Sequence, residues 1–205
     1  MRMKKRTILL VSFLVLVFAM TTGCASKEYK PETVSGYDAD ENTMILNQDG
    51  TITEFIADKF DTSSYSVDAL RTSIESEITA YNQSNPDAIS LSLCELNGGK
   101  VYIEILYKTA EDYSAFNGVN MFYGSIADAI NSGYNFDAVT YKNFEGEAFT
   151  LDSITTDENT KVFVIFKDYN IRAMQGVKYH EAQDTAFNEY EISPAKGDGI
   201  HSVII

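Results

Sequence analysis

The chain has 205 residues, of which 12% are aromatic, and its 30 Asp and Glu against 16 Lys and Arg give a formal net charge of −14 at pH 7. The aromatic content excludes a globally disordered chain, and the length is sufficient for a domain with a hydrophobic core. The acidic balance argues against nucleic acid and anionic lipid headgroups as partners, because phosphate binding needs a basic surface.

The first residues have the pattern of a secretory signal peptide. Residues 1–6 carry four basic side chains, and an apolar run from Ile8 to Met20, broken only by Ser12, follows. This run is short for a membrane-spanning helix, which needs about 20 apolar residues. A charged start before a short apolar core is typical of a signal peptide. We therefore predict that residues 1–23 are removed from the mature protein.

Residues 21–24, Thr-Thr-Gly-Cys, resemble the lipobox, the cleavage site of bacterial lipoproteins. In that family the cysteine thiol receives a diacylglyceryl group, and the signal is cut just before it. The resemblance implies that Cys24 is the lipid attachment site and that the mature protein is held at the outer face of the cell membrane. The alternative is ordinary secretion, with cleavage after Ala25.

Residues 24–42 have almost no apolar periodicity and hold many charged side chains, so we predict a lipidated flexible tether there. Residues 43–205 are predicted to form a single globular domain. Its first half predicts two β-hairpins. In residues 43–57, two β-rich runs flank Asp49-Gly50, a strong turn pair. Residues 88–96 and 100–108 alternate apolar and polar side chains on either side of another glycine-containing turn.

One long and two short helices are predicted. Ser66 is a favoured N-cap, and Asn85-Pro86 ends the long helix. Its apolar residues recur at three- and four-residue spacing, which predicts an amphipathic helix: Val67, Leu70, Ile74, Ile78 and Tyr81. Residues 109–118 and 125–133 each begin with a capping side chain and end at a glycine, which predicts two short helices.

The remainder of the chain is richer in predicted strands. The continuous apolar run 161–167 predicts a central strand. The apolar C-terminus, Val203 to Ile205, is predicted to pair in a sheet. Other strand-like runs are 138–144, 147–151, 177–182, 189–193 and 201–205. This order of elements favours an α+β fold with a mostly antiparallel sheet, one long amphipathic helix and two short helices.

The region from Asp68 to Ala129, which includes EDYSAFNG and MFYGSIADA, resembles small uncharacterised extracytoplasmic lipoproteins of Gram-positive gut anaerobes. That family has no assigned activity. The resemblance therefore implies a location and not a function.

Four common sequence motifs for catalysis are absent. The chain has no GxSxG, GxxxxGK, GxGxxG or HExxH pattern. A metal site could combine His180 and His201 with carboxylates such as Glu181 and Asp184, or these could be ordinary polar residues on late strands. Cys94 lies in a strand-like run and is predicted to be a buried, inert thiol. We therefore assign no catalytic residue, no metal and no cofactor.

Aromatic residues are concentrated between residues 113 and 144, at twice the average density of the chain. Such a surface suits peptide or sugar binding, or the rings could fill the core where short helices pack on the sheet. The candidate ligand-binding residues are Tyr113, Phe116, Phe122, Tyr123 and Tyr134.

These observations predict a membrane-anchored extracytoplasmic lipoprotein whose domain is a non-catalytic binding or interaction module. Its expected partners are the membrane, through the lipid anchor, and an extracellular peptide, glycan or protein. The alternative is a cell-envelope hydrolase with an unrecognised carboxylate and histidine site, so enzymatic activity is left open.

Overall fold

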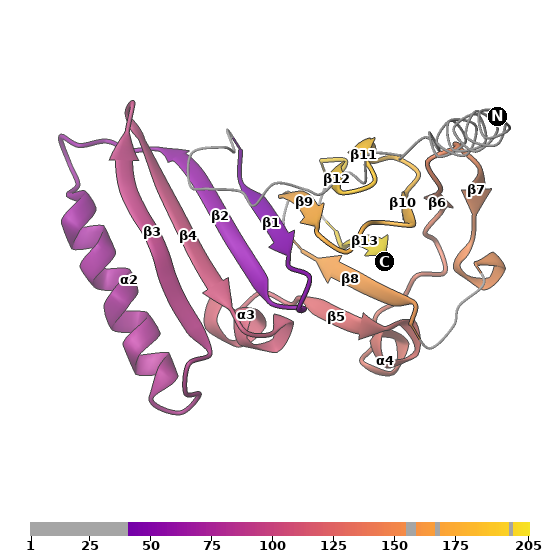
Figure 1. Cartoon of the computed structure of the whole chain (residues 1–205), viewed down its shortest axis with the longest axis horizontal. Helices are drawn as coiled ribbons and strands as arrows, with labels where there is room; N and C mark the ends of the chain where they lie inside the picture. The colour runs from indigo at the N-terminus through magenta and orange to yellow at the C-terminus, as the bar shows by residue number, and fades with distance from the viewer. Residues whose placement is uncertain (1–40, 155–158, 167–168, 197–198) are drawn as a thin grey trace, which may run out of the picture. The chain divides into compact units, whose positions relative to one another are not determined.

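A computed structural model describes residues 41–154, 159–166, 169–196 and 199–205 of the chain. The predicted signal peptide, Cys24 and nearly all of the predicted tether lie outside these residues. The described residues belong to one compact unit and form two β-sheets and three α-helices (Figure 1). The fold is therefore α+β, as predicted, but with two sheets where the sequence predicted one.

The first sheet has seven strands in the order β11-β12-β9-β1-β2-β4-β3. Their bounds are β1 Thr43–Leu46, β2 Ile52–Lys59, β3 Ile89–Asn97, β4 Lys100–Tyr107, β9 Asn170–Ala173, β11 Thr185–Asn188 and β12 Glu191–Ser193. Its neighbouring strands are antiparallel except β1 and β9, which pair in parallel with Thr43 opposite Asn170. The sheet is therefore mixed.

Both predicted hairpins are confirmed. Gly50 has φ 87° in the turn between β1 and β2, where the Asp49 carboxylate accepts a hydrogen bond from the Thr51 amide at 3.0 Å. Gly98 and Gly99 have φ 58° and 82° in the turn between β3 and β4. Residues with side chains rarely adopt this left-handed backbone, so the glycines fix the position of each turn.

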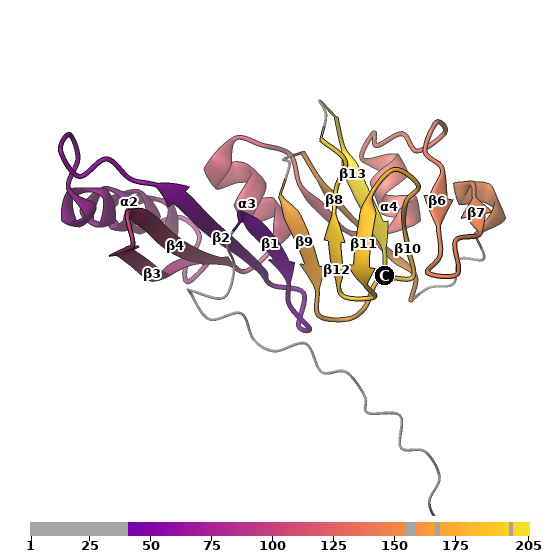
Figure 2. The ribbon, with the colours of Figure 1, turned by 90° about the horizontal axis from the view of Figure 1, so that it is seen from above.

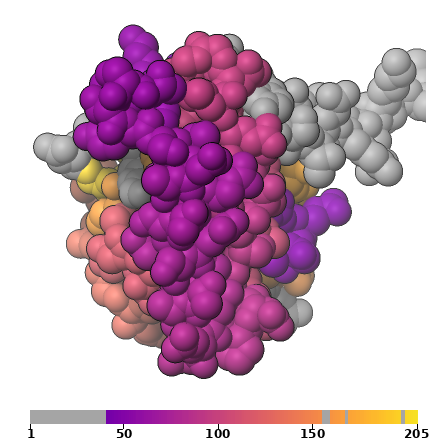
Figure 3. Space-filling view, turned by 90° about the vertical axis from the view of Figure 1, so that its left-hand side faces the viewer, coloured from indigo at the N-terminus to yellow at the C-terminus, as the bar shows by residue number. Residues whose placement is uncertain are grey.

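The longest described helix, α2 (Val67–Asn82), begins at the predicted N-cap. The Ser66 hydroxyl accepts a hydrogen bond from the Ala69 amide at 3.4 Å. At the other end, the Asn82 side chain donates to the Ile89 carbonyl at 2.8 Å and accepts from the Ile89 amide at 3.1 Å, which joins the helix to β3. Ile78 is buried against the sheet, and Figure 3 looks onto the uncovered outer surface of the helix.

The two predicted short helices are also present, as α3 (Ala110–Asn117) and α4 (Ile126–Asn131). The hydroxyl of Thr109 caps α3 and that of Ser125 caps α4. Gly118 ends α3 in the left-handed region, with φ 64°. The capping residues therefore specify both helices locally, as the sequence predicted.

The second sheet has six antiparallel strands in the order β5-β8-β13-β10-β6-β7, and all of them except β5 can be identified in Figure 2. Their bounds are β5 Phe122–Ser125, β6 Tyr141–Lys142, β7 Ala148–Phe149, β8 Lys161–Ile165, β10 Tyr179–Glu181 and β13 His201–Ile204. The 3-10 helix η1 (Leu151–Ser153) follows β7. The apolar strand β8 lies inside the sheet, between β5 and β13, and β13 pairs with both β8 and β10. The predictions for the 161–167 run and for the C-terminus are confirmed.

The two sheets share one hydrophobic core. Met44 and Leu46 of the first sheet pack in the same cluster as Phe163 and Val203 of the second. Cys94 is fully buried in this cluster, and burial raises the pKa of its thiol, which agrees with the predicted inert cysteine. A second cluster forms where α4 packs against β8, β13 and β6.

One polar network lies inside the shared core. The Tyr107 hydroxyl donates a hydrogen bond to the Glu54 carboxylate at 2.9 Å and accepts one from the Asn117 amide at 3.1 Å. Burial, and then the nearby charge of Glu54, raise the pKa of Tyr107, Tyr113 and Tyr169 far above the ordinary value. These tyrosines therefore keep their protons and surround a carboxylate that is only 2% exposed.

Candidate functional site

An open pocket of about 580 Å³ lies beside α3 and β5. It is bounded by α3, by the start of β5, by the segment that follows α4, and by the residue after β8. Its lining residues are Glu111, Ser114, Ala115, Asn120, Met121, Phe122, Ser132, Gly133, Tyr134 and Phe166. We take this pocket as the candidate functional site and call it the aromatic pocket.

Three aromatic rings in the pocket contact one another in sequence. The ring centroids of Phe122 and Tyr134 are 5.5 Å apart, and those of Tyr134 and Phe166 are 6.2 Å apart. Both pairs are tilted, which is a favourable arrangement for aromatic side chains. Phe166 is 40% exposed. Together the rings present an apolar surface that a ligand could reach from solvent.

Two glycines allow the rings to take these positions. A Cβ atom on Gly124 would lie 2.9 Å from the tip of the Phe122 ring, so the ring folds back over a residue without a side chain. Gly133 has φ 93° just after α4, and the Tyr134 amide then donates to the Ala129 carbonyl at 3.1 Å. This turn ends the helix and directs the chain so that Tyr134 lines the pocket.

The charge of the pocket is negative. Glu111 is the one charged residue that lines it among the residues that the structure describes. Burial, and then the negative charge of Glu111, raise the pKa of the Tyr134 hydroxyl. A neutral tyrosine hydroxyl can both donate and accept hydrogen bonds. The pocket therefore suits an uncharged or cationic ligand with an apolar face, and it would repel an anion.

The five predicted ligand-binding aromatics do not form one surface. Phe122 and Tyr134 line the pocket. Tyr113 is buried on α3, with its ring 5.0 Å from that of Tyr107. Phe116 is partly buried against the core, with an edge-on contact to Tyr81 at 5.8 Å. Tyr113 and Phe116 of α3 therefore pack in the core, which was the alternative to a binding surface in the sequence analysis.

Tyr123 lies on the other face of β5 from Phe122, because successive side chains of a strand point to opposite faces. Its hydroxyl donates to the Gln175 side chain at 3.0 Å, and the Lys161 ammonium lies 5.0 Å from its ring centroid. Phe166, which completes the pocket, was not among the candidates. It lies outside the aromatic-rich segment, at the end of the predicted central strand, so its place depends on tertiary structure.

The two histidines occupy different environments. Nδ1 of His180 lies 2.8 Å from the Glu181 carbonyl and donates to it, and its ring lies 5.5 Å from that of Phe144. His201 instead approaches Glu181 and Asp184. The sequence singled out all four residues, and the structure groups one histidine with both carboxylates. Burial is the largest cause that raises the pKa of Glu181 and of Asp184.

Comparison of the chain with protein-family models, with curated protein sequences and with solved structures returns no match. Within the part of the chain that the structure describes, no helix has the length and apolar character needed to cross a membrane. A function can therefore be inferred only from the residues of this chain.

Proposed function

We propose that this chain is a membrane-anchored extracytoplasmic lipoprotein whose domain, residues 43–205, is a non-catalytic binding module. The anchor rests on the charged start, the apolar run and Cys24. The binding role rests on one observation, the row of Phe122, Tyr134 and Phe166 in an open pocket. In this proposal α2 is the amphipathic helix of the domain, with its apolar stripe toward the sheet.

The anchor is tested on the mature N-terminus. Two acyl chains hold a protein far more stably than one, since each buried CH₂ contributes about 0.8 kcal/mol. Mass spectrometry of native membranes should identify a peptide that begins at diacylated Cys24, and Cys24→Ala should release the folded protein from the membrane. An unmodified N-terminus after Ala25, or a variant that stays bound, would refute the anchor.

The ligand class follows from the lining of the pocket. Exposed aromatic rings stack on the apolar faces of sugars or on peptide side chains, and the hydroxyl of Tyr134 can exchange hydrogen bonds with either. Glu111 adds attraction for a basic group. A glycan or an uncharged or basic peptide of the extracellular space therefore fits the pocket better than an acidic ligand.

Binding is tested with glycan and peptide arrays probed by the full chain. We expect Tyr134→Ala and Phe166→Ala each to weaken a captured ligand by about fivefold or more, which is the usual effect of truncating a central aromatic. Tyr65→Ala is the matched control, because Tyr65 is 68% exposed and does not line the pocket. Equal binding by all three variants would refute the pocket as the ligand site.

One observation favours the alternative, a cell-envelope hydrolase. The group of Glu181, Asp184 and His201 has the residue types that acid–base catalysis uses. However, Glu181 and His201 are each only 4% exposed, which leaves a substrate little access to them. Hydrolysis of cell-wall glycans or peptides by the purified chain, abolished by Glu181→Gln, would replace the binding proposal with this one.

A further inference from the structure

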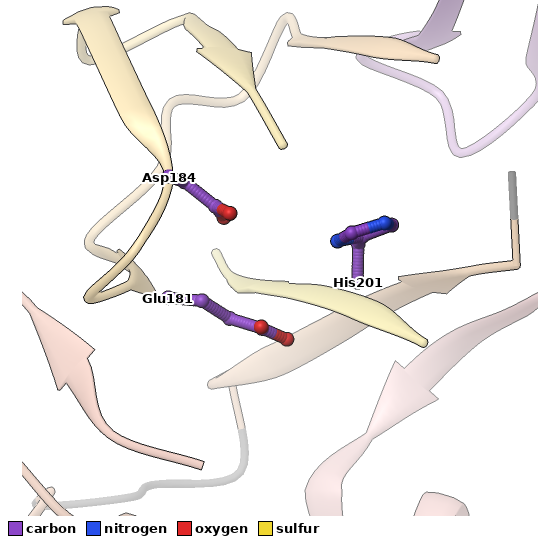
Figure 4. Close-up of side chains that lie close together, drawn as sticks. All are labelled: Glu181, Asp184 and His201. Atoms are coloured by element: carbon purple, nitrogen blue, oxygen red, sulfur yellow. The ribbon is translucent and has the colours of Figure 1, made fainter. Parts of the chain in front are cut away.

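We propose that Glu181, Asp184 and His201 form a binding site for a divalent transition-metal cation, with Zn²⁺ as the best fit. Glu181 is the last residue of β10, Asp184 lies just before β11, and His201 is the first residue of β13. One ligand atom from each residue lies within 4.8 Å of the other two. Figure 4 shows the three side chains, carried by separate segments, around one small space.

The distances between the three ligand atoms are close to those in a site that holds a metal ion. Zinc binds oxygen and nitrogen ligands at about 2.0–2.2 Å, so tetrahedral ligands lie roughly 3.4 Å from one another. The observed separations, at most 4.8 Å, exceed this by little more than 1 Å. Small rotations of the two carboxylates would bring the three ligands onto one ion without any movement of the strands.

Both carboxylates are held by hydrogen bonds, and the Gln183 side-chain amide donates to Oε2 of Glu181 at 3.1 Å. The Ser202 amide and hydroxyl donate to Oε1 of Glu181 at 2.9 and 2.8 Å. The Tyr141 hydroxyl lies 2.8 Å from the Ser202 hydroxyl and donates to it. The Ala195 amide donates to Oδ1 of Asp184 at 3.0 Å. Such outer contacts orient the ligands of a metal site.

The other oxygen of Asp184 points to a missing partner. Oδ2 is buried, and it has no hydrogen-bond partner among the described residues. A buried polar atom without a partner destabilises the folded state, and more so when it is charged. Native structures rarely keep such an atom, so each one needs an explanation. A cation between Asp184, Glu181 and His201 would supply it.

The donor set selects the class of metal. One imidazole nitrogen and two carboxylate oxygens suit Zn²⁺, with Mn²⁺ as a weaker competitor, and three protein ligands leave a position for water. Calcium fits poorly, since it takes six to eight oxygen ligands. The competing explanation is a direct contact of His201 with the two carboxylates that needs no metal.

Metal binding distinguishes these two explanations. The full chain, purified in detergent and treated with a chelator, is titrated with ZnCl₂ and separately with MnCl₂ by isothermal calorimetry. We expect one zinc per chain. Asp184→Asn and Glu181→Gln keep the side-chain shape, and each should weaken zinc binding by more than the roughly 10–100-fold that loss of an outer contact costs. Glu145→Gln removes one negative charge at an exposed turn and should bind zinc like the original chain.

The proposal is wrong if the chain does not bind zinc saturably, or if zinc binds equally well to all three variants, as it would on scattered surface acids. Zinc-edge X-ray absorption of the unsubstituted chain keeps the test independent of how the variants fold. It should show oxygen and nitrogen at about 2.0–2.2 Å with one imidazole. A sulfur ligand at about 2.3 Å would place the metal on a cysteine and overturn the assignment.

Discussion

Tyr107→Phe tests the polar network inside the core with the loss of a single oxygen atom. The Tyr107 side chain is fully buried, and its hydroxyl joins Glu54 to Asn117. A hydrogen bond to a charged group contributes about 1.5–3 kcal/mol to stability, and one between neutral groups about 0.5–1.5 kcal/mol. The variant loses one of each kind. We therefore expect its free energy of unfolding to fall by about 2–4 kcal/mol.

The loss is measured by urea denaturation followed by circular dichroism. Domains of this size are typically stable by only about 5–15 kcal/mol, so the shift in midpoint should be large. Tyr65→Phe is the matched control, because its hydroxyl belongs to a residue that is 68% exposed. Its effect should stay within about 0.5 kcal/mol. If Tyr107→Phe is as mild as Tyr65→Phe, the network does not stabilise the core and this reasoning fails.

Three further predictions concern stability. Deletion of Ser202–Ile205 should lower it by at least about 3 kcal/mol, because Val203 and Ile204 are fully buried; an unchanged thermal midpoint would contradict the pairing of β13. Gly118→Ala should cost about 1 kcal/mol, since its φ of 64° disfavours a side chain although the space is open. Gly199→Ala, also in open space but outside the left-handed region, should cost less in the same urea assay. Burial raises the pKa of Tyr141 to about 12, so stability should depend on pH in the alkaline range. The contribution of Tyr141 to the free energy of unfolding, about 3 kcal/mol, is complete below pH 10 and disappears as the pH rises toward 12. Ultraviolet titration should show some tyrosines ionising only on unfolding, and ionisation of all 13 near pH 10 in a folded chain would contradict this.

Local signals predicted the local elements well. Asp49-Gly50 and the capping residues Ser66 and Thr109 act within a few residues of themselves, and the structure contains the hairpin and helices that they specify. The strands β9 and β11 were not predicted. Each has only four residues, and β9 pairs in parallel with a strand near the start of the domain. Parallel pairing is set by tertiary contacts and leaves no turn signal in the sequence.

The candidate sites were predicted only in part for the same reason. Composition located the aromatic-rich segment, but it could not separate Tyr113, which faces the core, from Tyr134, which lines a pocket. Phe166 joins that pocket through the pairing of β5 with β8. His201 meets Glu181 because β13 lies beside β10. In each case the missing information was which strands are neighbours.

The parallel pairing of β1 with β9 also bears on how the chain folds. Beside this pair, the Asn170 side chain donates to Glu41, 129 residues away in the sequence. The hairpins β1–β2 and β3–β4 can form as soon as their own residues are available, whereas the first sheet is completed only after a long loop has closed. Such contacts slow folding, because the entropy of loop closure is lost before the contact is gained. During synthesis, the chain would therefore expose the open edge of β1 until most of its sequence had emerged.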